Sequence, residues 1–255
     1  MAALTSTLRV ASWNIREGVP ADSSNSEIQV RDEVVSLLMS RRVDIIGLQE
    51  VPFDQSARSW LLNIIQDHTP LGHIAYNVLS ESSFQSNCRA GVALASRFPL
   101  TDCKPIQFNN PELRTELQGN PIRTYDKGLV SATVLLEGQD ISIVSLHTFP
   151  FHLFGRDADE SAFRQMWTDL SAELDRLRIR PLIVCGDFNT SKRDLVIGQN
   201  GRTLSRAVIN EPTHRGQPID DVLYSKEFKA VNVEVISNFS DHRICITDLE
   251  IECNA

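Results

Sequence analysis

Long hydrophobic runs and cysteine pairs are both missing from this sequence. No window approaches the length of a membrane-spanning helix, and residues 1–7 contain no apolar stretch of signal-peptide length. The five cysteines are an odd number, and they form neither a CxxC pair nor a Cys/His metal-binding spacing. This usage is typical of reduced thiols rather than of a disulfide framework or a zinc site. We therefore expect a cytoplasmic protein that does not insert stably into membranes.

The sequence also lacks any Pro-, Gly- or Ser-rich or strongly charged stretch that would divide it into domains. A chain of 255 residues can bury a substantial core, and its 42% hydrophobic and 23% charged content is ordinary for a soluble globular protein. We expect one domain over residues 1–255, and a monomer.

Short apolar runs bounded by Gly, Pro, Asn or Asp predict a protein rich in β-strands. We expect strands near residues 8–15, 43–48, 74–79, 90–95, 129–136, 141–146, 182–185, 219–224, 231–236 and 244–251. Stretches with apolar residues at helical spacing predict helices near 27–40, 57–66 and 160–178. Many strands with a few helices outside them fit packed sheets covered by helices, although periodicity alone supports only a mixed α and β fold.

Polar and ionisable side chains end several of these apolar runs. Such a position lies where a sheet meets solvent, so strand ends from distant parts of the chain can converge on one pocket. The residues concerned are Asn14, Glu50, His147, Asp187, Asn189, Asp220, Asp241 and His242. Carboxylates, imidazoles and carboxamides together form an oxygen-rich cage for a hard divalent cation, with bases beside it. That combination indicates phosphoester chemistry.

The segments that carry these residues follow a recognisable order: an Asn after the first strand, QE at 49–50, a strand-end His, GDFN at 186–189, ID at 219–220 and SDH at 240–242. A further segment at 91–100, GVALASRFPL, contains the tetrapeptide SRFP. Together they resemble the endonuclease/exonuclease/phosphatase superfamily over nearly the whole chain. The resemblance implies an α+β, four-layer α/β/β/α sandwich, in which two mostly antiparallel sheets pack face to face with helices outside. It also implies a metal-dependent phosphoric ester hydrolase.

A metal ion is expected at Glu50. An unpaired carboxylate at the end of an apolar strand is costly to desolvate, and a divalent cation removes that cost. The resemblance implies that Glu50 is the principal ligand of Mg²⁺ or Mn²⁺, with Asn14 beside it and Asp241 as a further ligand. The alternative from the residues alone is that Glu50 caps the turn at Pro52 and that Asn14 makes a turn hydrogen bond.

Three other residues are expected to act on the phosphate. Asp187 and Asn189 are separated by one residue, so in extended chain their side chains point the same way; an Asx turn is the alternative. The resemblance implies that Asp187 directs the attacking water and that Asn189 orients it or holds a phosphate oxygen. It also implies that His147 contacts the scissile phosphate or assists the leaving group.

Asp220 and His242 are expected to form an acid/base pair. A carboxylate that accepts from one imidazole nitrogen fixes the tautomer and favours the charged ring, and the resemblance pairs the Asp of ID with the His of SDH. Asp221 is the competing candidate, but adjacent residues of a strand face opposite ways, which favours Asp220. The expected reaction is in-line attack of water without a covalent enzyme intermediate.

The choice of substrate depends on weaker signals. A net charge of −8 argues against tight, nonspecific coating of DNA, although bound cations would offset part of that charge at the site. We expect hydrolysis of DNA or RNA phosphodiesters. A hydrolase of a small or lipid phosphoester and a non-catalytic binding module are the alternatives.

Two segments near the predicted site have open roles. The segment HTFPFHLFGR at 147–156 contains Phe149, Phe151 and Phe154, which could stack on a base, contact a lipid or pack under the following helix. The polar stretch at 114–127 either holds phosphate through its cations or is a solvated loop.

Overall fold

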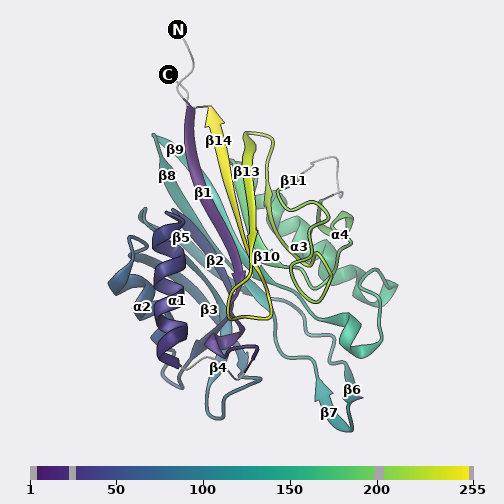
Figure 1. Ribbon diagram of the computed structural model, residues 1–255. Helices are drawn as coiled ribbons and strands as arrows, with labels where there is room; N and C mark the ends of the chain where they lie inside the picture. Colours follow the sequence, from purple (N-terminus) through teal and green to yellow (C-terminus); the bar gives the residue numbers. More distant parts are fainter. Residues whose placement is uncertain (1–4, 23–26, 198–203, 253–255) are drawn as a thin grey trace.

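The computed structural model describes residues 5–22, 27–197 and 204–252, and two six-stranded β-sheets form its centre (Figure 1). The first sheet has the strand order β13-β14-β1-β2-β4-β3. Its strands, in chain order, are β1 (Thr5–Asn14), β2 (Ile45–Phe53), β3 (His73–Glu81), β4 (Arg89–Ser96), β13 (Phe228–Ile236) and β14 (Ile244–Glu252). All neighbours pair antiparallel except β1 and β2, which run parallel.

The second sheet has the order β11-β12-β10-β9-β8-β5. Its strands are β5 (Thr101–Gln107), β8 (Gly128–Leu136), β9 (Gln139–His147), β10 (Leu182–Asp187), β11 (Ser205–Arg206) and β12 (Asp220–Tyr224). Here β9 and β10 are the parallel pair, and the other neighbours are antiparallel. A separate hairpin of β6 (Arg114–Leu117) and β7 (Asn120–Arg123) projects at the lower right of Figure 1.

Helices cover the outer face of each sheet. The helices α1 (Glu27–Ser40) and α2 (Trp60–His68) pack on the first sheet, and α3 (Arg164–Leu177) and α4 (Asp194–Ile197) pack on the second. Short 3₁₀ turns occur at Arg16–Gly18, Phe151–Phe154 and Ser161–Phe163. The described helices include none with the length and apolar character needed to cross a membrane. The predicted four-layer α/β/β/α sandwich is confirmed.

The alternation of side chains along β10 shows how the layers are filled. Ile183 and Cys185 face the core between the two sheets, whereas Leu182 and Val184 face α3. Successive residues of a strand point to opposite faces, so a strand covered on both sides reads as one continuous apolar run. The central strands could therefore be predicted from their apolar runs in the sequence.

Two of the predicted helices begin later than expected, and local turns explain the difference. Residues 54–58 form a turn in which the Asp54 carboxylate accepts from the backbone N–H of Ser56 and of Arg58, so α2 begins only after Ser59. The Ser59 hydroxyl caps α2 by accepting from the N–H of Leu62 at 3.3 Å. Before α3, the segment at 161–163 forms a 3₁₀ turn instead of a helical one.

The sequence did not predict β5, the β6–β7 hairpin, β11 or α4. Most residues of β5 are exposed, and it contains Pro105, which is tolerated because β5 lies at the edge of the sheet. An exposed edge strand and an exposed hairpin carry no apolar periodicity. The polar stretch at 114–127 is therefore largely a β-hairpin rather than an irregular loop.

A glycine at the centre of the sandwich sets how closely the two sheets approach. Gly47 of β2 faces Cys185 of β10, and a Cβ atom at Gly47 would lie 2.4 Å from the Cβ of Cys185 and 3.2 Å from that of Ser145. These distances are too short for any larger side chain without a shift of the backbone. Gly47 precedes Glu50 in the same strand, so the close approach also positions the first sheet's part of the predicted site.

We predict that Gly47→Ala destabilises the protein by about 1–3 kcal/mol, because the added methyl group overpacks the space between the sheets. A thermal melt of the variant should show a lowered Tm. Gly72→Ala is the matched control, since nothing lies within 4 Å of a Cβ atom built at that position. Equal melting of the two variants would contradict the close approach.

Candidate active site

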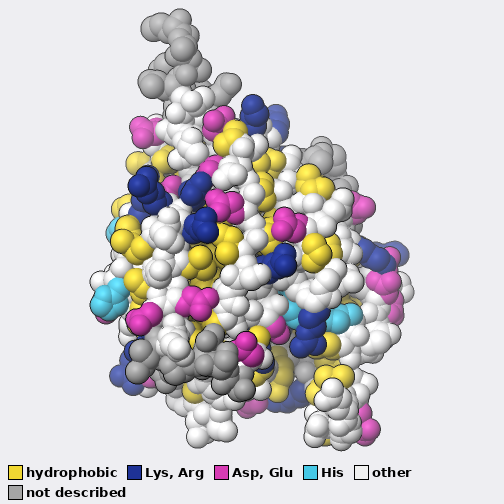
Figure 2. All heavy atoms as spheres, in the orientation of Figure 1, with side chains coloured by type: hydrophobic (Ala, Val, Ile, Leu, Met, Phe, Trp, Pro, Cys, Tyr) yellow, Lys and Arg dark blue, Asp and Glu magenta, His cyan; other side chains and the backbone are white. Residues whose placement is uncertain are grey.

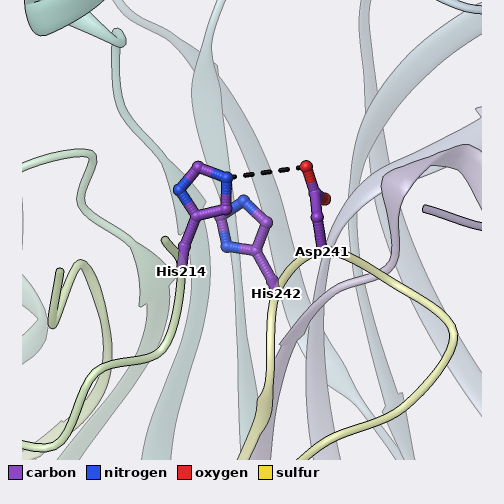
Figure 3. A group of neighbouring side chains, drawn as sticks. All are labelled: His214, Asp241 and His242. Atoms are coloured by element: carbon purple, nitrogen blue, oxygen red, sulfur yellow. Dashed lines mark ion pairs between the residues drawn. The ribbon is translucent and has the colours of Figure 1, made fainter. Parts of the chain in front are cut away.

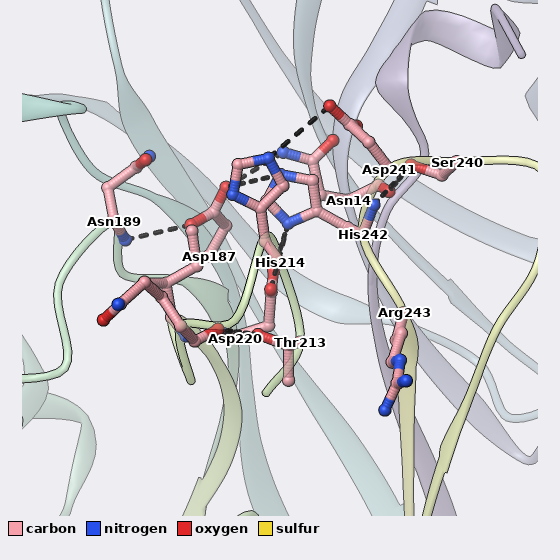
Figure 4. A network of polar contacts seen from close by, with 12 residues as sticks. Asn14, Asp187, Asn189, Thr213, His214, Asp220, Ser240, Asp241, His242 and Arg243 are labelled. Atoms are coloured by element: carbon pink, nitrogen blue, oxygen red, sulfur yellow. Dashed lines mark hydrogen bonds and ion pairs between the residues drawn. The ribbon is translucent and has the colours of Figure 1, made fainter. Parts of the chain in front are cut away.

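The predicted site residues lie together at one edge of the sandwich. Asn14, His147 and Asp187 are the last residues of β1, β9 and β10, and Asp220 is the first residue of β12. The register places His147 opposite Asp187 and Asp187 opposite Asp220. Because β9 and β10 are parallel and β12 runs in the opposite direction, these three side chains share one edge. Figure 4 shows Asp187, Asp220 and His242 converging there.

Asp187 is the centre of the polar network. Its Oδ2 atom accepts from Nδ2 of Asn14 at 2.9 Å and lies 3.3 Å from Nε2 of His147, and its Oδ1 atom accepts from the backbone N–H of Asn189 at 2.9 Å. The Asn189 carboxamide donates to the Thr148 carbonyl at 2.9 Å. Burial and the charge of Asp220 raise the pKa of Asp187 to about 6. Asp187 is thus a fixed carboxylate suited to accept a proton.

His242 and Asp220 form a buried pair. Nδ1 of His242 lies 2.9 and 3.1 Å from the two carboxylate oxygens of Asp220. Burial alone lowers the pKa of His242, but the charges of Asp220 and Asp187 outweigh it and raise the pKa to about 10. His242 is therefore an imidazolium, and its Nε2 atom lies 3.9 Å from Oδ2 of Asp187.

Asp221 points to the opposite face of β12. Its carboxylate lies 3.4 Å from Nε of Arg193 and 2.9 Å from Nε of Arg206, and it accepts from the backbone N–H of Val208 at 2.9 Å. Asp220, and not Asp221, contacts His242. The side chains of Asp221 and Arg193 are both almost completely buried, so this ion pair lies in the protein interior, on the face of β12 opposite to Asp220.

Glu50 enters the pocket from an irregularity of β2. The register of β2 with β4 shifts between Gln49 and Val51, and Glu50 has a left-handed backbone with φ of 53°. Among the described residues, none donates a hydrogen bond to its carboxylate, and the nearest basic atom with which it pairs is Nε2 of His147 at 4.0 Å. A half-buried carboxylate that accepts no hydrogen bond from the described residues, in the same cavity as the Asp187 carboxylate, fits a hard divalent cation such as Mg²⁺ or Mn²⁺.

Asp241 has a different environment from Glu50. One of its oxygens lies 3.5 Å from Nε2 of His214 (Figure 3). Its oxygens also lie 3.5 Å from Nε of Arg16 and 3.9 Å from Nη2 of Arg215. Burial raises the pKa of Asp241, but the His214 hydrogen bond and the nearby positive charges lower it below its usual value. Asp241 lies at the pocket as expected, and its role as a metal ligand stays a prediction because cationic groups already surround its oxygens.

Sequence reasoning did not assign Arg16 or His214 to the site, and it considered Lys127 only as one of the cations of the stretch at 114–127 that could hold phosphate. The half-buried Lys127 ammonium lies 3.1 and 3.2 Å from the two ring nitrogens of His147, and Lys127 directly precedes Gly128, which is paired with His147. A signal for Lys127 was its position directly before an apolar strand. Burial, Lys127 and His242 lower the pKa of His147 well below its usual value, so this ring is neutral.

The ring of His214 stacks on His242 with centroids 4.2 Å apart.

These side chains line a cavity of about 160 Å³, which adjoins a second cavity of about 390 Å³. The two cavities share His152, Asn189 and His214. Figure 2 shows histidine and basic side chains gathered on the lower side of the molecule, near the β6–β7 hairpin. The two cavities therefore meet at Asn189.

Two aromatic residues of the segment after His147, Phe149 and Phe151, belong to the core. Phe149 and Phe151 are completely buried, and the Phe151 ring packs on Phe163 with centroids 4.2 Å apart and on Trp167 at 6.2 Å. Burial excludes Phe149 and Phe151 as stacking surfaces for a base. Of the interpretations weighed for this segment, packing under the following helix is correct for these two residues.

The comparisons with known proteins agree with this arrangement. Residues 11–242 match the model of the endonuclease/exonuclease/phosphatase family. The chain therefore belongs to that family, and it is a phosphoric ester hydrolase of the metal-dependent type. No curated protein sequence matches the chain.

Solved structures of low sequence identity share the fold. An endonuclease/exonuclease/phosphatase from Beutenbergia cavernae is 18% identical with a TM-score of 0.69, over 96% of this chain and 72% of that one. The human nocturnin catalytic domain with bound sulfate is 20% identical with a TM-score of 0.64, over 97% and 96% of the two chains. Sphingomyelinase C from Streptomyces griseocarneus is 15% identical with a TM-score of 0.60, over 95% and 99%.

We predict that Asp221→Asn and Asp220→Asn differ in their effect on folding. Asp221→Asn leaves the buried Arg193 without its anionic partner, and the loss of one member of a buried ion pair costs about 3–5 kcal/mol. Asp220→Asn should cost less, because His242 can release its proton and keep a hydrogen bond to the new carboxamide. Urea unfolding of both variants measures the difference, and a larger loss for Asp220→Asn would show that the two carboxylates have been assigned to the wrong faces.

Proposed function

We propose that this protein is a divalent-metal-dependent phosphodiesterase that hydrolyses nucleic acid. The observation that carries the proposal is the convergence of Glu50, whose carboxylate accepts no hydrogen bond from any described residue, with the buried Asp187 and the charged pair of His242 and Asp220. A site that holds a cation, a proton acceptor and a proton donor within one small pocket contains the groups that phosphoester hydrolysis needs.

Each residue of the pocket has a proposed task. Asn14 and Glu50 would hold Mg²⁺ or Mn²⁺, with Asp241 as a further expected ligand, and a cation held there would supply polarisation of a phosphoryl oxygen and stabilisation of the leaving oxyanion. Asp187 accepts the proton of the attacking water, since the Asn14 carboxamide and the Asn189 N–H hold its oxygens in place.

The cationic and neutral donors face the negative charge that grows on phosphorus. His242 carries its proton because Asp220 stabilises the imidazolium, so it can neutralise a phosphoryl oxygen or protonate a leaving group. His147 stays neutral, and the Lys127 ammonium beside it supplies a further positive charge. Asn189 adds a carboxamide at the passage between the two cavities.

A nucleic acid is favoured over a compact monoester by the shape of the site. The catalytic cavity continues past Asn189 into the larger cavity, and Arg16 and Phe84 also line it, so a chain can extend beyond the scissile phosphate. The lining of the catalytic cavity is rich in charged and imidazole side chains, which suit a phosphate backbone better than acyl chains. The similarity to a sphingomyelinase keeps a lipid phosphodiester as the alternative.

We predict that Glu50→Gln abolishes Mg²⁺-dependent hydrolysis, because the loss of an anionic ligand weakens binding of a hard cation. Calorimetric titration of Mg²⁺ or Mn²⁺ should detect binding to the wild type and greatly weakened binding to the variant. Glu116→Gln, an exposed carboxylate of the β6–β7 hairpin, is the control and should behave as wild type.

The same preparation should be assayed on single-stranded DNA, single-stranded RNA and sphingomyelin vesicles. We expect cleavage of a nucleic acid with Mg²⁺ and none in excess chelator. Undiminished turnover in chelator would refute the metal requirement, and turnover of sphingomyelin alone would refute the substrate assignment while leaving the metal requirement intact.

We further predict that Asp220→Asn and His242→Ala each lower turnover by about 100-fold or more, since both remove the charged imidazole from the reaction. The double variant should lose little beyond the worse single variant, because residues that act as one unit are not additive. Steady-state kinetics on a common oligonucleotide provide the comparison. Losses that multiply would show that the two residues act independently.

A further inference from the structure

An exposed aromatic ring lies at the catalytic cavity. Phe84, in the connection between β3 and β4, is 44% exposed and lines the cavity together with Arg16, Glu50 and Asp187. Arg16 is the first residue of the 3₁₀ turn Arg16–Gly18, which follows β1. Part of the Phe84 ring is therefore open to solvent at the cavity.

Arg16 is fixed against this ring. Its guanidinium carbon lies 4.5 Å from the centroid of the Phe84 ring. Nη1 donates to the carbonyl oxygens of Val19 at 2.9 Å and Pro20 at 2.6 Å, and Nε lies 3.5 Å from Oδ1 of Asp241. The guanidinium thus lies over the ring in a cation–π contact. Its position does not depend on the ring alone, because the carbonyl oxygens of Val19 and Pro20 and the Asp241 carboxylate also hold it.

Glu17 holds the loop that carries Phe84 through hydrogen bonds. The buried Glu17 carboxylate accepts from the Ser82 hydroxyl and from the backbone N–H of Ser83 at 3.0 Å. The Ser82 oxygen in turn accepts from the N–H of Phe84 at 3.1 Å, and the Gln85 carboxamide donates to the Glu17 carbonyl at 3.3 Å. These contacts fix the backbone of Phe84 although its ring is exposed.

The segment that supplies both contacts is strained. Arg16 and Glu17 have φ angles of 50° and 54°, in the left-handed region that residues with a side chain disfavour, and Gly18 follows with φ of 70°. Consecutive left-handed residues place Arg16 on the Phe84 ring and turn Glu17 under the loop. Strain of this kind persists where surrounding contacts over-determine it, and it is concentrated at functional sites.

We propose that Arg16 and Phe84, here named the Arg16–Phe84 platform, stack a nucleobase of the substrate next to the reacting phosphate. The inference rests on the proposed function, because it places the base of a nucleic-acid substrate beside the site proposed to hydrolyse its phosphate. A base offers a π face to the ring and to the guanidinium. An acyl chain offers no such face, and it would remove the Arg16 guanidinium from water without compensation.

Binding of two single-stranded oligonucleotides of equal length tests the platform. One is oligothymidylate, and the other carries abasic tetrahydrofuran sites throughout, so that the two share the same phosphate charge. Calorimetry in chelator measures binding without hydrolysis. Phe84→Ala should weaken binding of oligothymidylate by about 5- to 150-fold for a stacked base and leave the abasic strand unchanged. Phe84→Trp should retain the preference for bases.

Phe84→Leu separates stacking from simple apolar contact, because it keeps an apolar side chain and removes the π face. It should lose the base preference as Phe84→Ala does, and full retention would overturn the platform. Ile179→Ala, which truncates an 81% exposed apolar side chain outside the cavity lining, is the matched control and should bind both strands as wild type. Thermal melts establish that every variant is folded.

The outcomes separate the platform from the proposed function. A wild type that binds oligothymidylate through Phe84 but never cleaves it refutes the proposed function and supports the platform. Cleavage of both strands that is indifferent to Phe84, with equal binding of the two, supports the proposed function and overturns the platform. Competition by thymidine monophosphate would assign the platform to a free nucleotide, and its failure to compete would assign it to the polymer.

Discussion

The rest of the site depends on two buried carboxylates that share one imidazole. Asp187 and Asp220 face each other across β10 and β12, and His242 contacts Asp220 at 2.9 Å while lying 3.9 Å from Asp187. Two anions in a poorly polarisable interior repel strongly unless a positive charge lies between them. The fold resolves this by keeping His242 charged and by raising the pKa of Asp187 to about 6. The protonation of Asp187 and His242 thus depends on the register of β10 and β12, which places Asp187 opposite Asp220.

Each sheet has a single parallel pair, β1 with β2 and β9 with β10. Parallel neighbours end at the same edge, so Asn14, His147 and Asp187 share one end of the sandwich. The two sheets must also approach closely, because Glu50 belongs to the first and Asp187 to the second. Gly47 permits this approach, and the bulge at Glu50 turns its carboxylate into the pocket. Topology and one small residue together bring the two halves of the site into contact.

The sequence predicts those parts of the molecule whose physical cause is local. Central strands covered on both faces appear as continuous apolar runs, and polar residues at their ends identify the pocket. The exposed β5 carries no such signal, and the turn at Asp54 that delays α2 depends on side-chain hydrogen bonds that periodicity does not detect. The sequence offered Lys127 only as one cation of the stretch at 114–127 and did not assign Arg16 to the site, because both positions follow from tertiary packing: Lys127 is half-buried beside His147, and Arg16 depends on a left-handed turn.

The charge balance of the pocket argues for an anionic substrate in spite of the acidic chain. With His147 neutral, the carboxylates and cations at the catalytic cavity compensate one another: Glu50, Asp187, Asp241 and the Asp220 that pairs with His242 on one side, and Arg16, Lys127, Arg215 and His242 on the other. A divalent cation bound at Glu50 would leave the cavity clearly positive. A phosphodiester would then enter a local field opposite to that of the whole protein, whose net charge is −8. Attraction would be confined to the cavity, which favours engagement of one phosphate over coating of a long polyanion.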